Sequence, residues 1–204
     1  MSAANSPPVI LASGSITRAA LLRAAGIELA VQPPLVDEVA AREALAEEGA
    51  NARDAATALA ELKAAQVSRT ALGGSLVLAA DQILDVGGSW IGKASDRFEA
   101  RQHLQLLRGR AHQLWSAAVL YRDGTRIWHA AEVATLHMRA FSNEWLETYL
   151  EAAGDAILQS VGCYQIEGLG SQMMTRMEGS YFAILGLPLL PLLQALRDHD
   201  ILGR

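Results

Sequence analysis

Short apolar runs of strand length alternate with alanine- and leucine-rich stretches of helix length in the first half of the chain. The run VILA at residues 9–12 leads into a helix that we expect Ser15 to cap and Gly26 to end. The run SLVLAA at residues 75–80 follows a predicted helix over residues 51–71. Because strands that alternate with helices pair in parallel, and because the later strands turn back as hairpins, we predict an α/β protein with a mixed sheet.

Turn and capping residues mark the remaining elements. A short strand near residue 30 is followed by two prolines, which favour an extended stretch that delivers Asp37 and Glu38. The further predicted elements are a hairpin around Gly87 and Gly88, a helix over residues 96–108, a hairpin around Asp123 and Gly124, a helix over residues 142–154, a strand-like and glycine-punctuated stretch over residues 163–186, and a last helix from Pro188.

The composition indicates a folded domain in a reducing compartment. Of the 204 residues, 51% are hydrophobic and 19% charged, which suits one domain over residues 1–204, either undivided or formed of two lobes. The net charge of −5 argues against nucleic-acid binding. Cys163 is the only cysteine, so no internal disulfide can form and we expect the cytoplasm. The first residues lack lysine, arginine and a long apolar run, and glycine and proline break the apolar stretch over residues 181–200, so we expect neither a signal peptide nor a membrane span.

The segment SGSITR at residues 13–18 joins the first strand to the first helix. Free backbone N–H groups at a helix N-terminus, the hydroxyls of Ser13 and Ser15 and the guanidinium of Arg18 are groups that together cradle a phosphate. The alternative is that Ser15 only caps the helix and that Arg18 is solvated. Taken alone, the segment favours the cap.

Three further side chains are candidates for chemistry on an anionic substrate. Asp81 directly follows a buried run and is expected at the edge of the sheet where ligands bind, as a metal ligand or a general base. The alternative is that Asp81 begins a turn. Lys63 lies on an alanine-rich helix, and Lys93 follows Gly92. Each lysine is either a substrate ligand or a solvent-facing cation, and the surface role is favoured for Lys63 taken alone.

Together these segments resemble the Maf family of nucleoside-triphosphate pyrophosphatases, and the resemblance runs nearly from end to end. Eight matching stretches in the family's order are far more specific than any one of them. They are LASGSITR, VDE at residues 36–38, LAELKA, AADQIL, IGKA, LRGRAHQLWSAAVL, VGCYQIEGLG and EGSYFAILGLPL. The chain departs from the family at two loop prolines, where it has Ile16 and Ala94.

The resemblance implies a twisted mixed sheet with flanking helices and a central cleft, similar to inosine-triphosphate pyrophosphatases. It implies hydrolysis of a nucleoside triphosphate between the α- and β-phosphorus, to a monophosphate and pyrophosphate. It further implies a divalent cation, Mg²⁺ or Mn²⁺, and a homodimer. The residues that the match carries over are Arg18, Lys63, Lys93 and Asp81 as catalytic residues, Ser13 and Ser15 as substrate-binding residues, and Glu38 with Asp81 as metal ligands.

Two positions bear on the base of the nucleotide. Gln82 and Glu167 stand in D-Q and E-G pairs, which resemble the branch of the family that acts on 7-methyl-GTP. N7-methylation makes guanine positive, so that Glu167 would attract it, whereas a glutamine suits a neutral pyrimidine. We therefore predict 7-methyl-GTP as the substrate, with a dTTP/UTP pyrophosphatase or a non-catalytic regulatory protein as alternatives. Trp90, Trp115 and Tyr164 are candidates to stack on the base, although core packing is the commoner role of such residues.

Overall fold

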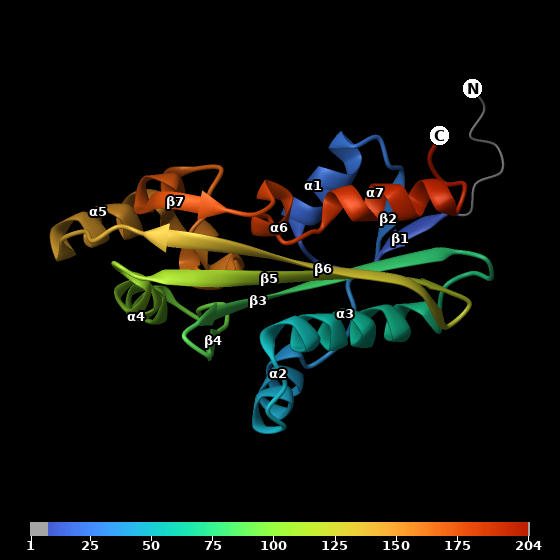
Figure 1. The fold of residues 1–204 in the computed structure, drawn as a ribbon, viewed down its shortest axis with the longest axis horizontal. Coiled ribbons are helices and arrows are strands. Elements are labelled where there is room, and N and C mark those ends of the chain that lie inside the picture. Colours follow the sequence, from blue (N-terminus) through green and yellow to red (C-terminus); the bar gives the residue numbers. More distant parts are fainter. Residues whose placement is uncertain (1–7, 204) are drawn as a thin grey trace.

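A computed structural model describes residues 8–203, and within them seven strands form one mixed sheet (Figure 1). The strands are β1 (Val9–Leu11), β2 (Leu29–Val31), β3 (Leu76–Val86), β4 (Ser89–Ile91), β5 (Ala111–Arg122), β6 (Thr125–Met138) and β7 (Met174–Glu178). Their order is β2-β1-β3-β5-β6-β7, and β4 pairs with β3 off this path. β1 pairs in parallel with β2 and β3, and the other pairs are antiparallel. Residues 1–7, from which we expect no signal peptide, lie outside the described residues.

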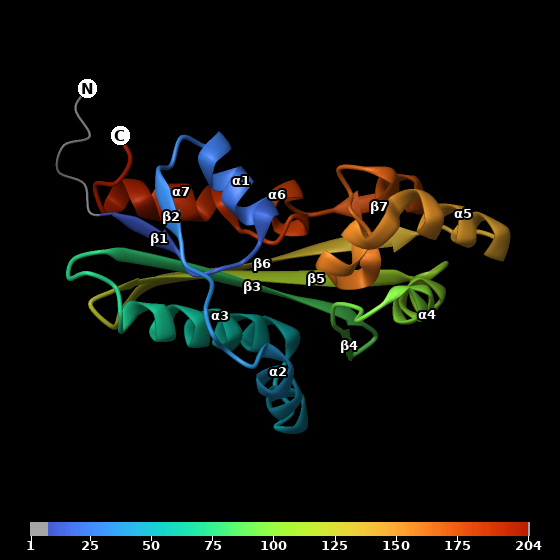
Figure 2. The same ribbon diagram turned by 180° about the vertical axis from the view of Figure 1, so that it is seen from behind.

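Helices cover both faces of this sheet. They are α1 (Ile16–Ala24), α2 (Glu38–Glu47), α3 (Ala52–Ser68), α4 (Arg97–Leu107), α5 (Asn143–Ala153), α6 (Tyr181–Ile184) and α7 (Leu189–Asp198). α1 and α7 lie on one face and α3 lies along the other, while α4 and α5 lie at the far end of β5 and β6 (Figures 1 and 2). The mixed α/β sheet with flanking helices that the sequence predicts is therefore confirmed.

Apolar side chains on each face of the sheet hold these layers together. On the α1 and α7 face, Leu22 and Leu196 pack with Leu78 of β3, and all three are fully buried. On the opposite face, α3 contributes small side chains, including Ala60 and Ala64. Small residues let a helix approach a sheet closely, which places the polar side chains of α3 within reach of β3.

Four helices begin where the sequence predicts. Ser15, Asn51, Asp96 and Ser142 each accept a backbone N–H from the first turn of the following helix, which satisfies a donor that has no partner within the helix. The hairpins between β3 and β4 and between β5 and β6 are also confirmed.

The helix α2 differs from the prediction, which has only an extended stretch leading to Asp37 and Glu38. Asp37 caps the helix by accepting the N–H of Ala40 at 3.0 Å, and Glu38 is its first residue. None of the residues of α2 is buried. The helix therefore lacks the buried apolar stripe from which helices are predicted.

Two further predictions are wrong. β3 continues through Asp81 to Val86, because β5 offers it hydrogen-bonding partners along its length, so Asp81 lies in mid-strand rather than at a strand end. The stretch over residues 163–186 is not strand-like throughout. Short 3₁₀ turns occupy most of residues 154–173, and only β7 is extended. Positive φ angles at Gly162 (74°) and Cys163 (59°) interrupt any extended backbone there.

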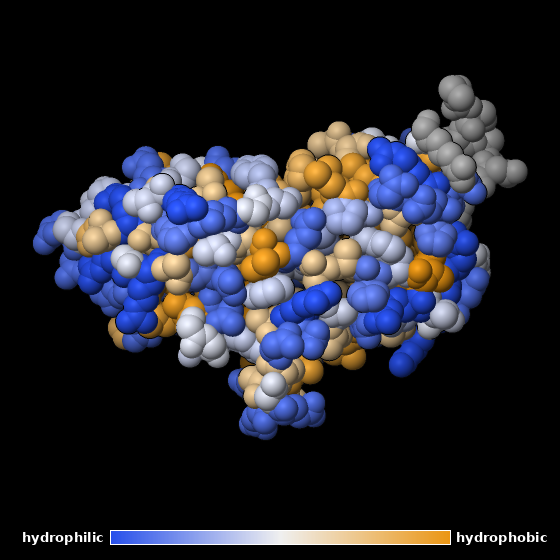
Figure 3. Space-filling model, in the orientation of Figure 1, coloured by the Kyte–Doolittle hydropathy of each residue, from blue (hydrophilic) through white to orange (hydrophobic). Residues whose placement is uncertain are grey.

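The face of the molecule in Figure 3 is largely hydrophilic and carries small, separate hydrophobic patches. Some of the most exposed apolar side chains, such as Leu35 and Leu72, stand outside the helices and strands. Among the described residues, no helix has both the length and the apolar character that crossing a membrane requires.

Candidate active site

A cleft of about 440 Å³ opens where β1 ends beside the middle of β3. β1 stops at Leu11 opposite Leu78, while β3 continues to Val86. On the side of β1, the middle of β3 therefore has no neighbouring strand and borders the cleft. All nine predicted site residues line this cleft: Ser13, Ser15, Arg18, Glu38, Lys63, Asp81, Gln82, Lys93 and Glu167. The structure thus brings them together, and their individual roles stay predictions.

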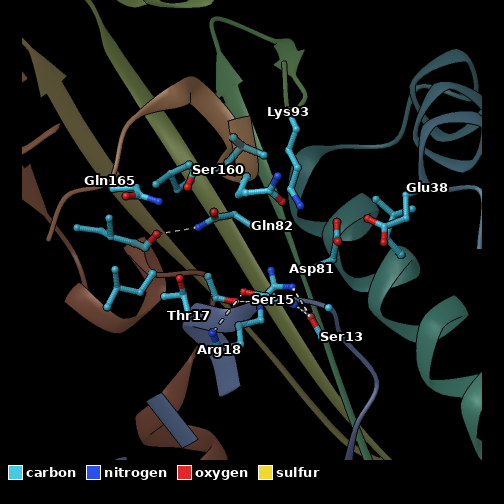
Figure 4. A pocket seen from close by; sticks show the side chains of 18 of the residues that line it. Ser13, Ser15, Thr17, Arg18, Glu38, Asp81, Gln82, Lys93, Ser160 and Gln165 are labelled. Carbon is cyan, nitrogen blue, oxygen red and sulfur yellow. Dashed lines mark hydrogen bonds between the residues drawn. The ribbon is translucent and has the colours of Figure 1, made fainter. Parts of the chain in front are cut away.

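The loop between β1 and α1 is organised by its two serines (Figure 4). The Ser15 hydroxyl accepts the N–H of Arg18 at 3.3 Å and so caps α1. The buried Ser13 hydroxyl accepts the N–H of Ser15 at 3.2 Å and a guanidinium N–H of Arg18 at 3.3 Å. The helix-cap alternative is therefore correct for Ser15, but both serines also line the cleft.

Arg18 ties three segments of the chain together. Its Nε donates to the carbonyl of Gly186 at 2.8 Å, and its Nη1 donates to the carbonyl of Ala80 at 2.8 Å. Burial lowers the pKa of Arg18, and the charges of Asp81 and Glu38 oppose that shift. A guanidinium stays protonated in proteins, so Arg18 is a cation within the cleft. Among the described residues, no hydrogen-bond acceptor pairs with its Nη2.

Lys63 joins the two predicted metal ligands. Its Nζ lies 2.5 Å from Oδ1 of Asp81 and 2.9 Å from Oε2 of Glu38. Lys63 and Asp81 are 4% and 7% exposed, whereas the Glu38 side chain is 47% exposed at the start of α2. The surface interpretation of Lys63 is therefore wrong. One ammonium draws two carboxylates from different elements to the same point of the cleft.

Lys93 and Arg42 add positive charge to the same space. Lys93 follows β4 and remains open to the cleft. Partial burial lowers its pKa; Glu38 acts against that shift, and the neighbouring charges of Arg18 and Lys63 add to it. Arg42, on α2, also lines the cleft, and the sequence analysis missed it. The only signal for it was its position four residues after Glu38, which is informative only once α2 is known to be a helix.

The amide of Gln82 has one possible orientation. Its nitrogen lies 2.9 Å from the carbonyl of Ala183 and 3.1 Å from that of Ile184, and carbonyls only accept hydrogen bonds. It also donates to the Ser116 hydroxyl at 2.9 Å, and that hydroxyl donates to the carbonyl of Ala183 at 2.7 Å. The NH₂ group is thus fully occupied. Gln82 can offer a ligand only its carbonyl oxygen, which is an acceptor.

A loop over residues 159–167 forms another wall of the cleft and carries the exposed Glu167. Ser160 and Gln165 face the cleft from this loop, on the side opposite Glu38 (Figure 4), and the sequence analysis missed both. Their polar side chains in a glycine-rich stretch were the available signal.

The buried Tyr164 anchors this loop. Its hydroxyl lies 2.6 Å from Nε2 of His112, which fixes the ring in the core at the wall of the cleft. Trp90 and Trp115 do not line the cleft and pack against the α3 face of the sheet. Trp90 and Trp115 therefore do not stack on a base in this cleft, whereas Tyr164, which lines it, stays a candidate.

Comparison with known proteins shows the family of the chain. The family model described as Maf-like protein matches residues 8–199. The chain belongs to the Maf family. Maf relatives from Granulibacter bethesdensis, Paramagnetospirillum magneticum and Caulobacter vibrioides are 47%, 49% and 49% identical to it. These matches cover 95%, 93% and 96% of this chain and 98%, 97% and 97% of the relatives. Each relative is named a nucleoside triphosphate pyrophosphatase, that is, a hydrolase of phosphorus-containing anhydrides, and the names specify no base.

Proposed function

We propose that this Maf protein hydrolyses nucleoside triphosphates between the α- and β-phosphorus, releasing a nucleoside monophosphate and pyrophosphate. The observation that carries the proposal is the Lys63 ammonium within 2.9 Å of both Asp81 and Glu38, in a cleft that also holds Arg18 and Lys93. Convergent cations next to paired carboxylates suit a polyphosphate better than a neutral substrate. The names of the relatives support the same reaction.

The donor set of the cleft suits a divalent cation. Among the described residues, no three or more His, Cys, Asp or Glu side chains cluster into a complete protein cage for a metal. Mg²⁺ usually takes one or two carboxylates and completes its shell with water and substrate phosphates. Asp81 and Glu38, which Lys63 draws together, would hold Mg²⁺ or Mn²⁺ in this way. When bound, the cation supplies positive charge to the phosphate oxygens.

The protein groups then divide the work of hydrolysis. Arg18 Nη2, Lys63 and Lys93 bind phosphate oxygens and hold the reacting phosphorus in line with a water molecule. Asp81 keeps one oxygen on Lys63, and its other oxygen takes the proton of the attacking water. The water oxygen bonds to the α-phosphorus, the bond from that phosphorus to the oxygen bridging it to the β-phosphorus breaks, and the electron pair leaves with pyrophosphate. Charge neutralisation and positioning supply most of the rate in such a reaction.

We further propose 7-methyl-GTP as the preferred substrate. Gln82 presents an acceptor, and the carboxylate of Glu167 is a second acceptor on the cleft wall. The Watson–Crick edge of guanine carries two adjacent donors, whereas uracil and thymine have one donor between two acceptors. The positive charge of the methylated base adds an attraction to Glu167 that GTP lacks. The rival functions are a dTTP/UTP pyrophosphatase and a non-catalytic regulatory protein.

Pyrophosphate release across 7-methyl-GTP, GTP, dTTP and UTP tests both parts of this proposal. The wild type should prefer 7-methyl-GTP, and Asp81→Asn should lose nearly all release while keeping its fold. Glu167→Gln should lower kcat/KM for 7-methyl-GTP about tenfold more than for GTP, because only the methylated base loses a charge partner. Preference for dTTP or UTP would overturn the base assignment. Full activity of a folded Asp81→Asn protein would overturn the catalytic one.

A further inference from the structure

Arg42 is a cation of the cleft that the mechanism above does not use. It lies on α2 four residues after Glu38, a spacing that puts both side chains on one face of a helix. Glu38 bonds Lys63 at 2.9 Å, so this face of α2 looks into the cleft, and Arg42 lines it. Figure 1 shows α2 projecting away from the sheet beneath α3. The face with Glu38 and Arg42 therefore forms a wall of the cleft.

The guanidinium of Arg42 lies directly against Gly92, in the segment that follows β4. A Cβ built on Gly92 would lie 2.8 Å from Nη2 of Arg42 and 3.0 Å from its Cζ and Nη1, so a larger residue there would move this guanidinium from its place. Within residues 8–203 this guanidinium makes no hydrogen bond or ion pair; hydrogen bonds from Ser95 are the main cause of the lowered pKa of Glu99, and the charge of Arg42 adds little to it. A guanidinium with unused donors, packed against the residue that precedes Lys93, is placed for an anionic ligand.

Apart from Glu167, which lies on the wall assigned to the base, the charges of the cleft match a triphosphate only when Arg42 is counted. Arg18, Lys63 and Lys93 against Glu38 and Asp81 leave one positive charge for the phosphates. A divalent cation brings the total to three, and Arg42 completes about the four charges that a triphosphate carries. Charge balance therefore favours a direct contact between Arg42 and the substrate.

The position of α2 indicates which part of the substrate Arg42 would contact. Figure 4 shows Ser160 and Gln165 at one end of the cleft, Glu38 at the other, and Asp81 and Lys93 between them. A nucleotide whose base meets the 159–167 loop extends its outer phosphates toward α2. We infer that Arg42 binds the pyrophosphate half of the substrate and its leaving product. This inference rests on the proposed function, because it assumes that a triphosphate crosses the cleft in that direction.

Calorimetric titration with pyrophosphate and with guanosine monophosphate, both in the presence of Mg²⁺, tests the inference without turnover. Arg42→Ala should weaken pyrophosphate binding about 10- to 100-fold, the range of a lost hydrogen bond to a charged group, and leave monophosphate binding within about twofold. Arg42→Lys should recover part of the loss, because it keeps the charge without the fork of donors. The matched control is Arg53→Ala, which removes an exposed arginine of α3 outside the cleft.

Gly92→Ala adds a second variant that keeps every charge. Its Cβ should displace the guanidinium of Arg42 and weaken pyrophosphate binding in the same direction. The inference is overturned if Arg42→Ala binds pyrophosphate as the wild type does, if Arg53→Ala weakens it equally, or if monophosphate binding falls as much. It is also overturned if the wild type does not bind pyrophosphate. A wild type that binds pyrophosphate but hydrolyses no nucleoside triphosphate would instead refute the proposed function.

Discussion

Protonation of His112 should destabilise this fold as the pH falls. The side chain is 1% exposed, and burial, with repulsion from His137 as a lesser cause, lowers its pKa from 6.5 to about 4. Between these two values the unfolded chain binds more protons than the folded chain. The stability that His112 contributes is therefore complete above pH 6.5 and is lost as the pH falls toward 4. The whole shift corresponds to about 3 kcal/mol, and about 2 kcal/mol of it should be lost between pH 7 and pH 5.

Urea unfolding at pH 7 and pH 5 measures this contribution. The free energy of unfolding of the wild type should fall by about 2 kcal/mol more than that of His112→Gln over this interval. His129→Gln is the matched control, because it removes an exposed histidine of β6 and should behave as the wild type does.

The measurement has two outcomes that contradict the reasoning. One is an equal loss of stability in the wild type and in His112→Gln. The other is a His112 ring that titrates near 6.5 by NMR in the folded wild type, a readout that stands even if His112→Gln fails to fold.

Three other perturbations test the structure. Arg18→Ala should lower the free energy of unfolding by about 2–4 kcal/mol, because the carbonyls of Ala80 and Gly186 lose a charged donor; unchanged stability in urea would contradict this role. Gly162→Ala should cost about 3 kcal/mol or more and Gly26→Ala about 1 kcal/mol, since φ is positive at both but an added Cβ meets Leu84 at 2.6 Å at Gly162 and nothing within 4 Å at Gly26; equal losses would contradict the crowding argument. In hydrogen exchange, the amides of α2 should exchange faster than those of α3, because none of the residues of α2 is buried. Pyrophosphate with Mg²⁺ should slow the exchange of α2, and unchanged exchange would count against contact between α2 and the ligand.

Local interactions made the capped helices and the hairpins predictable. Ser15, Asn51, Asp96 and Ser142 act on backbone groups within four residues of themselves, and the glycine-rich turns need no distant partner. The candidate site residues were also found in advance, because the resemblance to the Maf family carried them in order along the chain. The site roles, the metal, the base, the homodimer and the cytoplasmic location stay predictions.

Features that depend on partners far away in the chain were not predictable. β3 runs through Asp81 because β5, more than thirty residues later, pairs with it, and Lys63 is buried because Asp81 and Glu38 meet it from two other elements. Gln82 faces the cleft with its oxygen because carbonyls of α6, about a hundred residues away, take its nitrogen. Each outcome is set by hydrogen bonds and charges that exist only after the chain has folded. The order of the residues contains the local preferences, but which distant groups meet depends on packing in three dimensions.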